Sequence, residues 1–407
     1  MQTQFDDQVR RTALGARAEE IIQKCVHCGF CNVTCPTYNV LGDELDGPRG
    51  RIYLIKSAFE TQEPGPALQR HLDRCLGCRA CETTCPAGVR YGELLDVGRE
   101  VTENVVPRSL GDRLRRGVWR RVLTRPGLFR LLLGTGRLLR PVLPLRLRSL
   151  LPQRRKPGPI PTASHKRSVV MLRGCVQSAI DPVTNAAAVR VLSRLGIGVT
   201  LIRPMGCCGA IDHHLGASEP ARARMRANMQ AVLPLLDEGA EAVLAAASGC
   251  NMMLKDYARI FADDPEWADK AARFSAAVRD LSELVTVDNA VAIRRTSLAQ
   301  RRVAVHEPCS LTHGQGGAGR IEALLRALGF EVAPAQGATQ CCGAAGTYQL
   351  LQPDISDALL ERKLGELEQA GPELIVTANV GCQAQLQRQS KVPVRHWIEL
   401  LDARVDF

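Results

Sequence analysis

"CVHCGFCNVTCP" occupies residues 25–36 of the chain, and "CLGCRACETTCP" occupies residues 75–86. Both stretches place four cysteines at the spacing C-x2-C-x2-C-x3-C, and a proline follows at once. This spacing is typical of bacterial [4Fe–4S] ligation, in which three close thiolates bind one cluster and the fourth binds the other. Two copies therefore predict a domain with two [4Fe–4S] clusters that exchange their last ligands.

The exchange assigns eight ligands. Cluster one is predicted to take Cys25, Cys28, Cys31 and Cys85. Cluster two is predicted to take Cys75, Cys78, Cys81 and Cys35. The prolines Pro36 and Pro86 turn the chain away after the fourth thiolate. A pair of zinc sites is the alternative, because C-x2-C also begins zinc ribbons, although a ribbon needs only two close pairs of cysteines.

The segment between the two motifs indicates helices. It is longer than in a minimal ferredoxin, and "GDELDGPRGRIYLIKSAFE" and "ALQRHLDRC" within it have helical character. A helical dicluster domain is therefore expected. His27 lies among the ligands, and we interpret it as a neighbour that tunes the cluster, because the thiolates already complete the coordination.

Composition places these thiols in a reducing environment. The chain has 407 residues, 45% of them hydrophobic, and sixteen cysteines. Its first twenty residues contain no apolar core of a secretory signal, and no run reaches eighteen apolar residues, so neither a signal nor a transmembrane helix is expected. Clustered cysteines in a cytosolic chain usually bind metal rather than form disulfides.

Positive charge is concentrated in one segment. Residues 108–156 contain fifteen Lys or Arg and a single acid, Asp112, whereas the whole chain has a net charge of +11. Within residues 113–151 the arginines alternate with Leu, Val, Trp119 and Phe129. This pattern suits an interfacial helix on anionic lipid, a docking surface for an acidic partner, or a linker packed between domains. Nucleic acid is not expected, because aromatic stacking residues are scarce.

The last 240 or so residues contain an internal repeat. One set of cysteines is Cys175, Cys207, Cys208 and Cys250. The other set is Cys309, Cys341, Cys342 and Cys382. The offsets between them are 134, 134, 134 and 132 residues, and "MGCCGA" in the first repeat matches "TQCCGA" in the second.

Each repeat is predicted to alternate strands and helices. In the first repeat, strands are expected at 168–172, 198–202 and 242–246, and a helix at 221–239. This alternation favours a mostly parallel sheet covered by helices, with the cysteines gathered at the carboxyl ends of the strands. Gly209 and Gly343, which follow the paired cysteines, are expected to let the backbone approach a bulky ligand.

The four thiols of each repeat suffice for a third and a fourth metal site. The alternatives are a vicinal disulfide, buried structural cysteines, or a site that has lost its cluster. Four histidines flank these cysteines, and no catalytic role is assigned to them: His213, His214, His306 and His313.

The chain shows no dinucleotide fingerprint after a strand and no P-loop, and "GQGGAG" (314–319) lacks the required spacing. We therefore expect no flavin, no nicotinamide site and no catalytic residue in this chain.

The order of these segments resembles a known family. "MGCCGAIDHHL", "CCGAAGTY", "IVTANVGCQ", "VRHWIEL" and the two cysteine motifs are most similar to the iron–sulfur subunits of glycolate oxidase (glycolate dehydrogenase). The wider resemblance includes iron–sulfur subunits of glycerol-3-phosphate and lactate dehydrogenases and of heterodisulfide reductase. Members of the last group that hold unusual clusters end the repeat in C-x-x-C, whereas this chain has single cysteines at Cys250 and Cys382.

The resemblance implies an α+β multidomain protein. Its expected parts are a helical dicluster ferredoxin domain (1–107), a basic linker (108–165) and two α/β CCG (cysteine-rich) repeats (166–290 and 300–407).

The resemblance also implies a function. FAD-containing partner subunits would oxidise glycolate to glyoxylate, and this chain would relay the electrons towards a membrane quinone-type acceptor, peripherally bound at the inner face of the cell membrane. It would be part of an oxidoreductase but inactive alone. The alternatives are a lactate or glycerol-3-phosphate dehydrogenase subunit, a heterodisulfide or quinone reductase with catalytic CCG sites, and a zinc-bound interaction protein.

Overall fold

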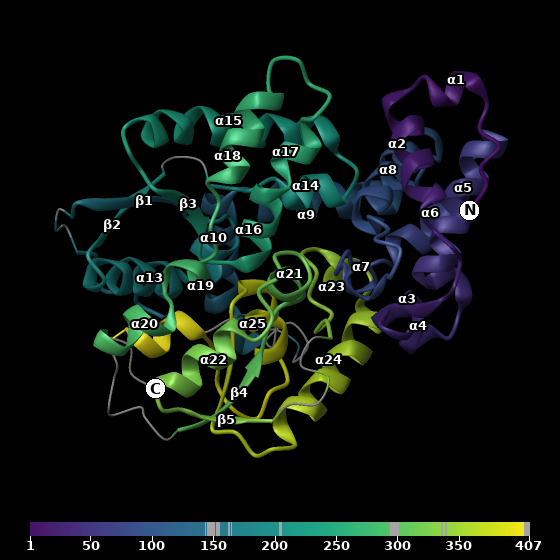
Figure 1. The fold of residues 1–407 in the computed structure, drawn as a ribbon. Helices are drawn as coiled ribbons and strands as arrows, with labels where there is room; N and C mark the ends of the chain where they lie inside the picture. Colours follow the sequence, from purple (N-terminus) through teal and green to yellow (C-terminus); the bar gives the residue numbers. More distant parts are fainter. Residues whose placement is uncertain are drawn as a thin grey trace.

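The structure is a computed structural model that describes residues 1–142, 144, 151, 155–161, 163, 165–202, 206–293, 301–334, 337 and 340–402. Figure 1 shows two bodies: a smaller helical one that contains the N-terminus, and a larger one that contains both parallel sheets. No helix among the described residues is long and apolar enough to cross a membrane.

The N-terminal body is built of short helices. They are α1 (Asp7–Arg10), α2 (Ala13–Gln23), α3 (Phe30–Val33), α4 (Pro36–Leu41), η1 (Glu44–Asp46), α5 (Pro48–Thr61), α6 (Pro66–Asp73), α7 (Ala80–Thr84) and α8 (Tyr91–Val105). Proline is the first residue of α4, α5 and α6, where its missing N–H costs no helical hydrogen bond. The core includes Ile21, Ile55 and Leu94 together with Cys25, Cys75 and Cys81. The expected helices between the cysteine motifs are confirmed as α5 and α6.

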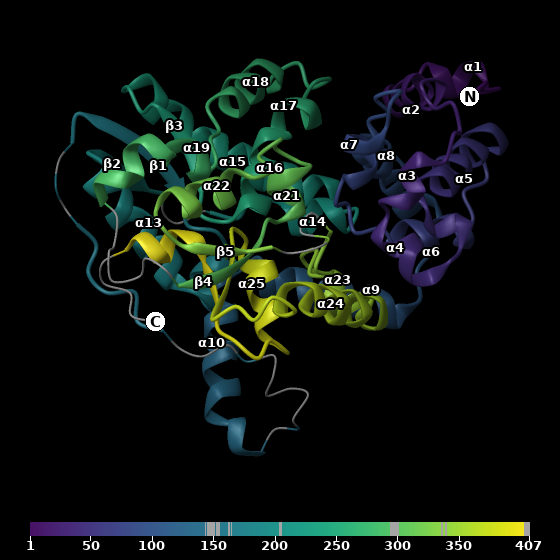
Figure 2. The ribbon, with the colours of Figure 1, turned by 60° about the horizontal axis from the view of Figure 1, so that its bottom comes forward.

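The basic segment forms two helices, α9 (Leu110–Leu123) and α10 (Pro126–Leu138), followed by η2 (Arg140–Val142). Ser109 caps α9 by accepting from the backbone N–H of Asp112. Pro126 begins α10 and sets the turn between the helices. The end of α10 projects from the body of the molecule, as Figure 2 shows at its lower edge.

The first repeat contains a three-stranded parallel sheet of order β2-β1-β3. Its elements are β1 (Arg167–Leu172), α12 (Gln177–Ile180), α13 (Pro182–Arg194), β2 (Ile197–Leu201), α14 (Ala210–His214), α15 (Ser218–Asp237), β3 (Ala242–Ala245), α16 (Ser248–Lys255), α17 (Tyr257–Ile260), α18 (Ala268–Ala276), α19 (Leu281–Leu284), α20 (Val287–Ala290) and η3 (Val291–Ile293). The strands and the helix expected from the sequence are confirmed as β1, β2, β3 and α15.

The second repeat contains a four-stranded parallel sheet of order β5-β4-β6-β7. Its elements are β4 (Arg302–His306), α21 (Cys309–Thr312), α22 (Arg320–Ala327), β5 (Glu331–Ala333), α23 (Tyr348–Leu351), α24 (Pro353–Glu368), β6 (Leu374–Thr377), α25 (Val380–Gln387), β7 (Val394–His396) and η5 (Trp397–Leu401). The predicted fold class, a helical N-terminal domain followed by two α/β repeats with parallel sheets, is therefore confirmed.

The two repeats share one hydrophobic core. Val169 and Leu244 of the first sheet belong to the same buried cluster as Val305 and Val376 of the second sheet. Polar contacts also join them: Ser248 Oγ lies 2.8 Å from Ser310 Oγ, at the junction of α16 with α21. The repeats therefore pack as one body, and this fixes their cysteine sets relative to each other.

Candidate metal centres

The two N-terminal cysteine motifs adopt the same unusual backbone conformation. His27 (φ 59°) and Gly29 (φ 84°) flank Cys28 in the left-handed region, and Gly77 (φ 65°) and Arg79 (φ 61°) flank Cys78 in the same way. Left-handed residues other than glycine are costly and are usually kept for function. Such turns direct successive backbone N–H groups into a concavity that suits anions, including the sulfur atoms of iron–sulfur sites.

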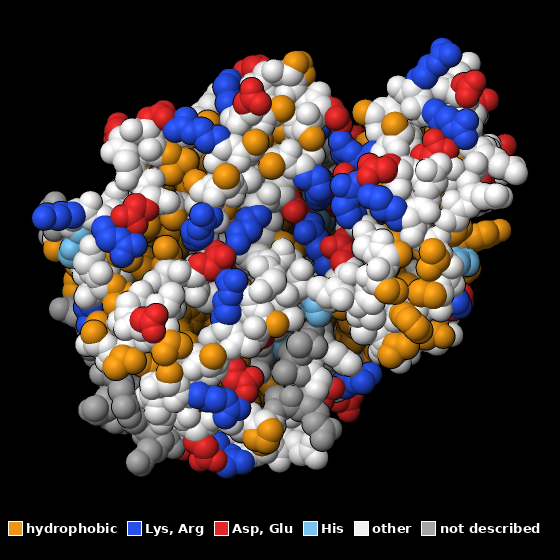
Figure 3. All heavy atoms as spheres, viewed as in Figure 1, with side chains coloured by type: hydrophobic (Ala, Val, Ile, Leu, Met, Phe, Trp, Pro, Cys, Tyr) orange, Lys and Arg blue, Asp and Glu red, His pale blue; other side chains and the backbone are white. Residues whose placement is uncertain are grey.

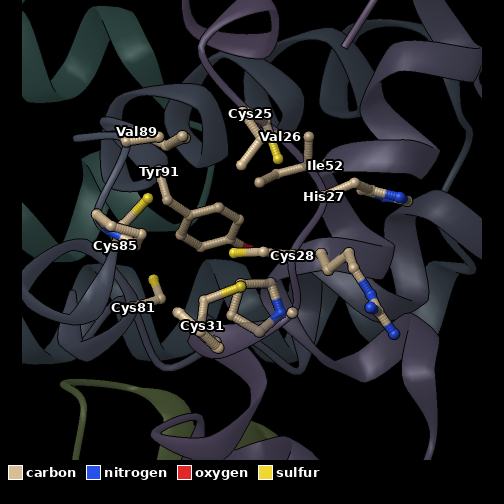
Figure 4. A pocket seen from close by; sticks show the side chains of 16 residues that line it. Cys25, Val26, His27, Cys28, Cys31, Ile52, Cys81, Cys85, Val89 and Tyr91 are labelled. Atoms are coloured by element: carbon tan, nitrogen blue, oxygen red, sulfur yellow. The ribbon is translucent and has the colours of Figure 1, made fainter.

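The first group of thiols lines a small cavity of about 30 Å³. Figure 4 shows Cys25, Cys28, Cys31 and Cys85 around it, together with Cys81 of the second motif, and the ring of His27 points away. Burial raises the pKa of the Cys31 thiol to about 11, and the nearby thiols of Cys25, Cys28 and Cys85 add to the rise. The fourth cysteine of the second motif thus lies with the first three of the first motif.

The second group is more deeply buried. Burial raises the pKa of Cys81, and its neighbours Cys78, Cys75 and Cys35 contribute. Cys75 Sγ accepts hydrogen bonds from the backbone N–H of Gly77 (3.5 Å) and from the Tyr91 hydroxyl (3.7 Å). Four thiols with donors directed at sulfur fit the requirements of a [4Fe–4S] cluster. Cysteines of both motifs thus lie together in each group, and the ligand assignment stays a prediction.

A buried charged network lies beside the second group. Asp46 accepts from Arg74 (2.8 Å) and is 2.8 Å from His71 Nδ1, and Arg51 lies 3.4 Å from the same carboxylate. Burial opposes the charge on Arg51, but the negative charges of Cys75, Tyr91, Cys35 and Asp46 together raise the pKa of its guanidinium. The second group therefore has a permanent cation next to it.

The two groups differ in their access to solvent. Cys28 is exposed, and so are its apolar neighbours Val26 (68%), Phe30 (60%) and Val33 (73%). An apolar patch is visible over α3 and α4 in Figure 3. The second group instead lies beneath the surface, towards the CCG repeats.

The four thiols of the first repeat meet at the carboxyl end of its sheet. Cys175 donates a hydrogen bond to Cys207, which raises the pKa of Cys175 and lowers that of Cys207. Cys250 hydrogen-bonds to Cys208, and this bond together with burial raises the pKa of Cys250. All sixteen cysteines of the chain are free thiols, so the structure does not contain the vicinal disulfide that the sequence left open.

The thiols of the second repeat form a chain of hydrogen bonds. It runs from Cys309 to Cys341, then to Cys342 and finally to Cys382. These contacts and burial raise the pKa of Cys309 and Cys342. The third and fourth sets that the sequence predicted are therefore each brought together, which is the geometry a metal site requires.

Cys78 connects the N-terminal groups to the second repeat. Burial is the main cause of its raised pKa, and the next largest is the nearby thiol of Cys309. Cys78 likewise contributes to the raised pKa of Cys341. The second thiol group of the ferredoxin-like domain and the thiols of the second repeat are thus close neighbours, a contact between residues more than 200 positions apart.

A cavity of about 570 Å³ lies between the cysteine sets of the two repeats. Thiols of both repeats line it, together with Cys75. The remaining wall is largely apolar and includes Trp119 and Val122 of α9 and Phe129 and Leu132 of α10. This volume and this mostly apolar lining are typical of sites for small organic ligands.

The four histidines near the repeats occupy different environments. His213 Nε2 lies 3.2 Å from Asp96 at the interface between the two bodies. His313 Nδ1 lies 2.9 Å from the Thr83 hydroxyl. His214 lines the large cavity, and burial lowers its pKa to about 3.

His306 is the functional candidate that sequence reasoning missed. It is completely buried beside Cys342 and Cys382. The signal that could have revealed it is a difference between the repeats: "VVMLRGC" has Leu172 where "VAVHEPC" has His306.

The glycines after the paired cysteines lie in tightly packed, left-handed positions. A side chain at Gly343 would place its Cβ 2.7 Å from the carbonyl oxygen of Ser356 in α24, and one at Gly209 would meet Ala221 and Met225 of α15. Both glycines are left-handed, with φ of 84° and 88°. They permit close packing of the cysteine loop on a helix, and the approach of a bulky ligand stays a prediction.

Comparison with known proteins agrees with this arrangement. A family model for a 4Fe-4S dicluster domain matches residues 21–89, and one for a cysteine-rich domain matches residues 169–255 and 303–387. The chain is 47% identical, over the full length of both proteins, to the glycolate oxidase iron-sulfur subunit of Escherichia coli K12. The chain belongs to the family of glycolate oxidase iron–sulfur subunits.

Other relatives of this chain are less similar to it. A probable glycolate oxidase iron-sulfur subunit of Bacillus subtilis is 30% identical over 89% of the chain and 88% of its own length. Lactate utilization protein A of Bacillus velezensis is 28% identical over 56% of the chain and 97% of its own length. The resemblance inferred from the motifs is thus confirmed, and both family models support iron–sulfur binding.

Proposed function

We propose that this chain is the electron-transfer subunit of a glycolate-oxidising complex. A partner subunit that carries FAD would oxidise glycolate to glyoxylate, and this chain would accept the electrons and pass them to a membrane quinone. Bound at the thiol groups, [4Fe–4S] clusters would supply one-electron transfer. The observation that carries the proposal is the succession of thiol sets, with exposed Cys28 in the first set and Cys78 of the second set close to Cys309.

Ligand roles follow from the thiol groups. Cys25, Cys28, Cys31 and Cys85 would hold the first cluster, and Cys75, Cys78, Cys81 and Cys35 would hold the second. The sets in the two repeats would hold further iron–sulfur centres. The chain's own residues would keep the second cluster apart from water and adjust the potentials of both clusters through hydrogen bonds to sulfur and through local charge.

Electron entry is best supported at the face around Cys28. It is the exposed cysteine of the four in its group, and Val26, Phe30 and Val33 form an apolar surface around it. Apolar patches of this kind on soluble domains favour association with another protein. Docking of the FAD-containing subunit here would shorten the distance from flavin to first cluster.

Electron exit is best supported at the large cavity. A lipid-soluble quinone is a flat ring with polar oxygens at its edge, and the cavity offers mostly apolar walls with few polar groups. Gln177 Oε1 is one of these, because it is buried in the wall and has no hydrogen-bond partner among the described residues. This cavity also favours the second candidate function, in which the CCG sites themselves reduce the quinone.

The helices α9 and α10 would associate with the membrane surface. They expose apolar side chains, including Leu114 (70%), Leu131 (66%) and Leu138 (83%), among exposed arginines such as Arg121 and Arg130. This combination suits the interface of an anionic bilayer. Because the same helices form part of the cavity wall, a quinone could reach the cavity from the lipid, with the chain peripherally bound at the inner face of the cell membrane.

The test begins with the chain purified anaerobically, which should be brown from iron–sulfur absorption; a colourless, zinc-loaded protein would refute the proposal. The isolated chain should oxidise none of glycolate, lactate or glycerol 3-phosphate. With its flavoprotein partners, glycolate should bleach the clusters. Bleaching by lactate alone would reassign the complex.

The entry face has its own test. Phe30→Asp should weaken binding to the flavoprotein, whereas Val105→Asp, at a similarly exposed apolar residue on α8, should not. Equal binding by both variants would exclude this face.

A further inference from the structure

His306 is the last residue of β4 and lies in the core of the second repeat. No contact among the described residues accounts for a polar side chain at this place. The residue is fully buried. Neither Nδ1 nor Nε2 has a hydrogen-bond partner among the residues that the structure describes. A buried imidazole without partners loses its hydration without compensation, which is costly and rare in native proteins. An additional group that satisfies a ring nitrogen would remove this penalty.

The group that His306 faces is the thiol set of the second repeat. One ring nitrogen of His306 and the sulfur atoms of Cys342 and Cys382 all lie within 4.8 Å of one another. Cys342 is hydrogen-bonded to Cys341, and Cys341 is hydrogen-bonded to Cys309. Imidazole nitrogen and thiolate sulfur are the common protein ligands of iron and zinc.

The first repeat lacks this feature at the equivalent place. His306 pairs in register with Thr377 on β6, and the corresponding pair in the first sheet is Leu172 with Ala245. Thr377 Oγ1 is also buried without a partner among the described residues. A polar pair thus replaces an apolar pair beside the thiols of one repeat.

We propose that His306 is a nitrogen ligand of an iron–sulfur centre in the second repeat, together with Cys342 and Cys382. The first repeat, with leucine in that position, would hold a centre bound by thiolates alone. This inference rests on the proposed function, which assigns iron–sulfur centres to the repeats. Its consequence is chemical asymmetry, because histidine in place of a thiolate raises the reduction potential of an iron–sulfur centre.

The difference between the two repeats also determines the order in which they would receive electrons. The mixed centre is the one next to Cys78, whose thiol lies close to Cys309. A centre of raised potential at that position accepts electrons from the second cluster of the N-terminal domain. The second repeat would therefore be the first acceptor among the repeats.

The test uses the full chain, purified anaerobically and labelled with ¹⁵N-histidine. Pulsed EPR of the reduced protein should show one strongly coupled ¹⁵N nucleus. His306→Leu, which installs the residue of the first repeat, should abolish this coupling. His306→Cys should abolish it too while it retains the iron, because a thiolate replaces the imidazole. The control His313→Asn, at the histidine four residues after Cys309, should keep the coupling.

A Cys342→Ser variant separates this inference from the proposed function. It should lower the iron content by about four atoms per chain if a [4Fe–4S] centre occupies the second repeat. Unchanged iron content in that variant would refute the centre itself and, with it, the ligand. Iron that depends on Cys342, with no ¹⁵N coupling or with a coupling that survives in His306→Leu, would overturn the ligand assignment and leave the relay intact.

Discussion

Arg51 is predicted to raise the reduction potential of the second cluster. Reduction adds one negative charge to the cluster, and a buried cation stabilises that charge. Arg51 Nη1 donates to Thr37 Oγ1 over 3.2 Å, and this oxygen lies 3.2 Å from Cys35 Sγ, so nitrogen and sulfur are at most about 6.4 Å apart. The arginine is 1% exposed, so water screens the interaction poorly.

The size of the effect follows from Coulomb's law. At about 6.4 Å and an effective dielectric constant of about 20, a unit charge contributes about 2.6 kcal/mol, or about 110 mV for a one-electron couple. Cluster charge is spread over several atoms, and Asp46 offsets part of the cation. We therefore expect Arg51→Gln to lower the potential of the second cluster by about 50–100 mV.

The assay is a redox titration of the anaerobic protein followed by EPR. Arg51→Lys keeps the charge and should shift the potential of the second cluster much less than Arg51→Gln. The first cluster serves as an internal control, because its thiols are a separate group, and its potential should stay unchanged. An unshifted second cluster in Arg51→Gln, with the iron content intact, would refute the electrostatic reasoning. Equal shifts in both variants would do the same, because they would show that packing rather than charge matters.

Three further predictions concern the fold and its surfaces. Gly343→Ala should lower the free energy of unfolding by about 1–3 kcal/mol in chemical denaturation, because Gly343 has a left-handed φ and packs closely on Ser356. The control Gly365→Ala, which faces open space on α24, should not lower it. Asp96→Asn removes a carboxylate that accepts from Arg259 at 2.7 Å and should lower the free energy of unfolding by about 1.5–3 kcal/mol. The control Asp263→Asn, in a more exposed ion pair, should lower it by less than about 1 kcal/mol. Deleting residues 113–151 should abolish binding to anionic vesicles, which in the intact chain should weaken as salt is added; salt-insensitive binding after deletion would indicate another anchor.

The charge on Asp96 also gives a pH dependence. Burial alone would raise its pKa, but His213 and Arg259 hold it well below the ordinary value. A carboxyl with a depressed folded pKa contributes stability above its unfolded pKa of about 3.9 and loses it as pH falls below that value. The stability difference between the native protein and Asp96→Asn should therefore be largest near neutral pH and shrink in acid. A difference that grows as pH falls would contradict this assignment.

Much of the fold could be predicted because its signals are local. The cysteine spacing at residues 25–36 and 75–86 predicted a dicluster domain, and β-branched runs predicted β1 and β2 almost to the residue. The 134-residue offset predicted that Cys175 and Cys309 occupy equivalent places. Each of these signals lies within a short stretch or in a direct repeat of one.

The contacts that join the parts could not be predicted in this way. The proximity of Cys78 to Cys309 depends on how the two bodies pack against each other, and the sequence around either cysteine gives no sign of that packing. The amphipathic pattern of 113–151 indicates helices, but not that Trp119 and Phe129 form a cavity wall. His306 was visible as a departure between the repeats, yet only the fold shows that its ring meets the thiols.

The account's central claim is that electrons from glycolate pass through this chain, and stopped-flow spectroscopy of the assembled complex tests it most directly. Mixing with glycolate should reduce the partner's flavin first, then bleach the clusters, then reduce an added quinone. With Cys78→Ser, reduction of the flavin should persist at an unchanged rate, while reduction of the quinone should fall by at least tenfold. Quinone reduction at the native rate in this variant would contradict the claim, because electrons would then reach the acceptor without passing Cys78.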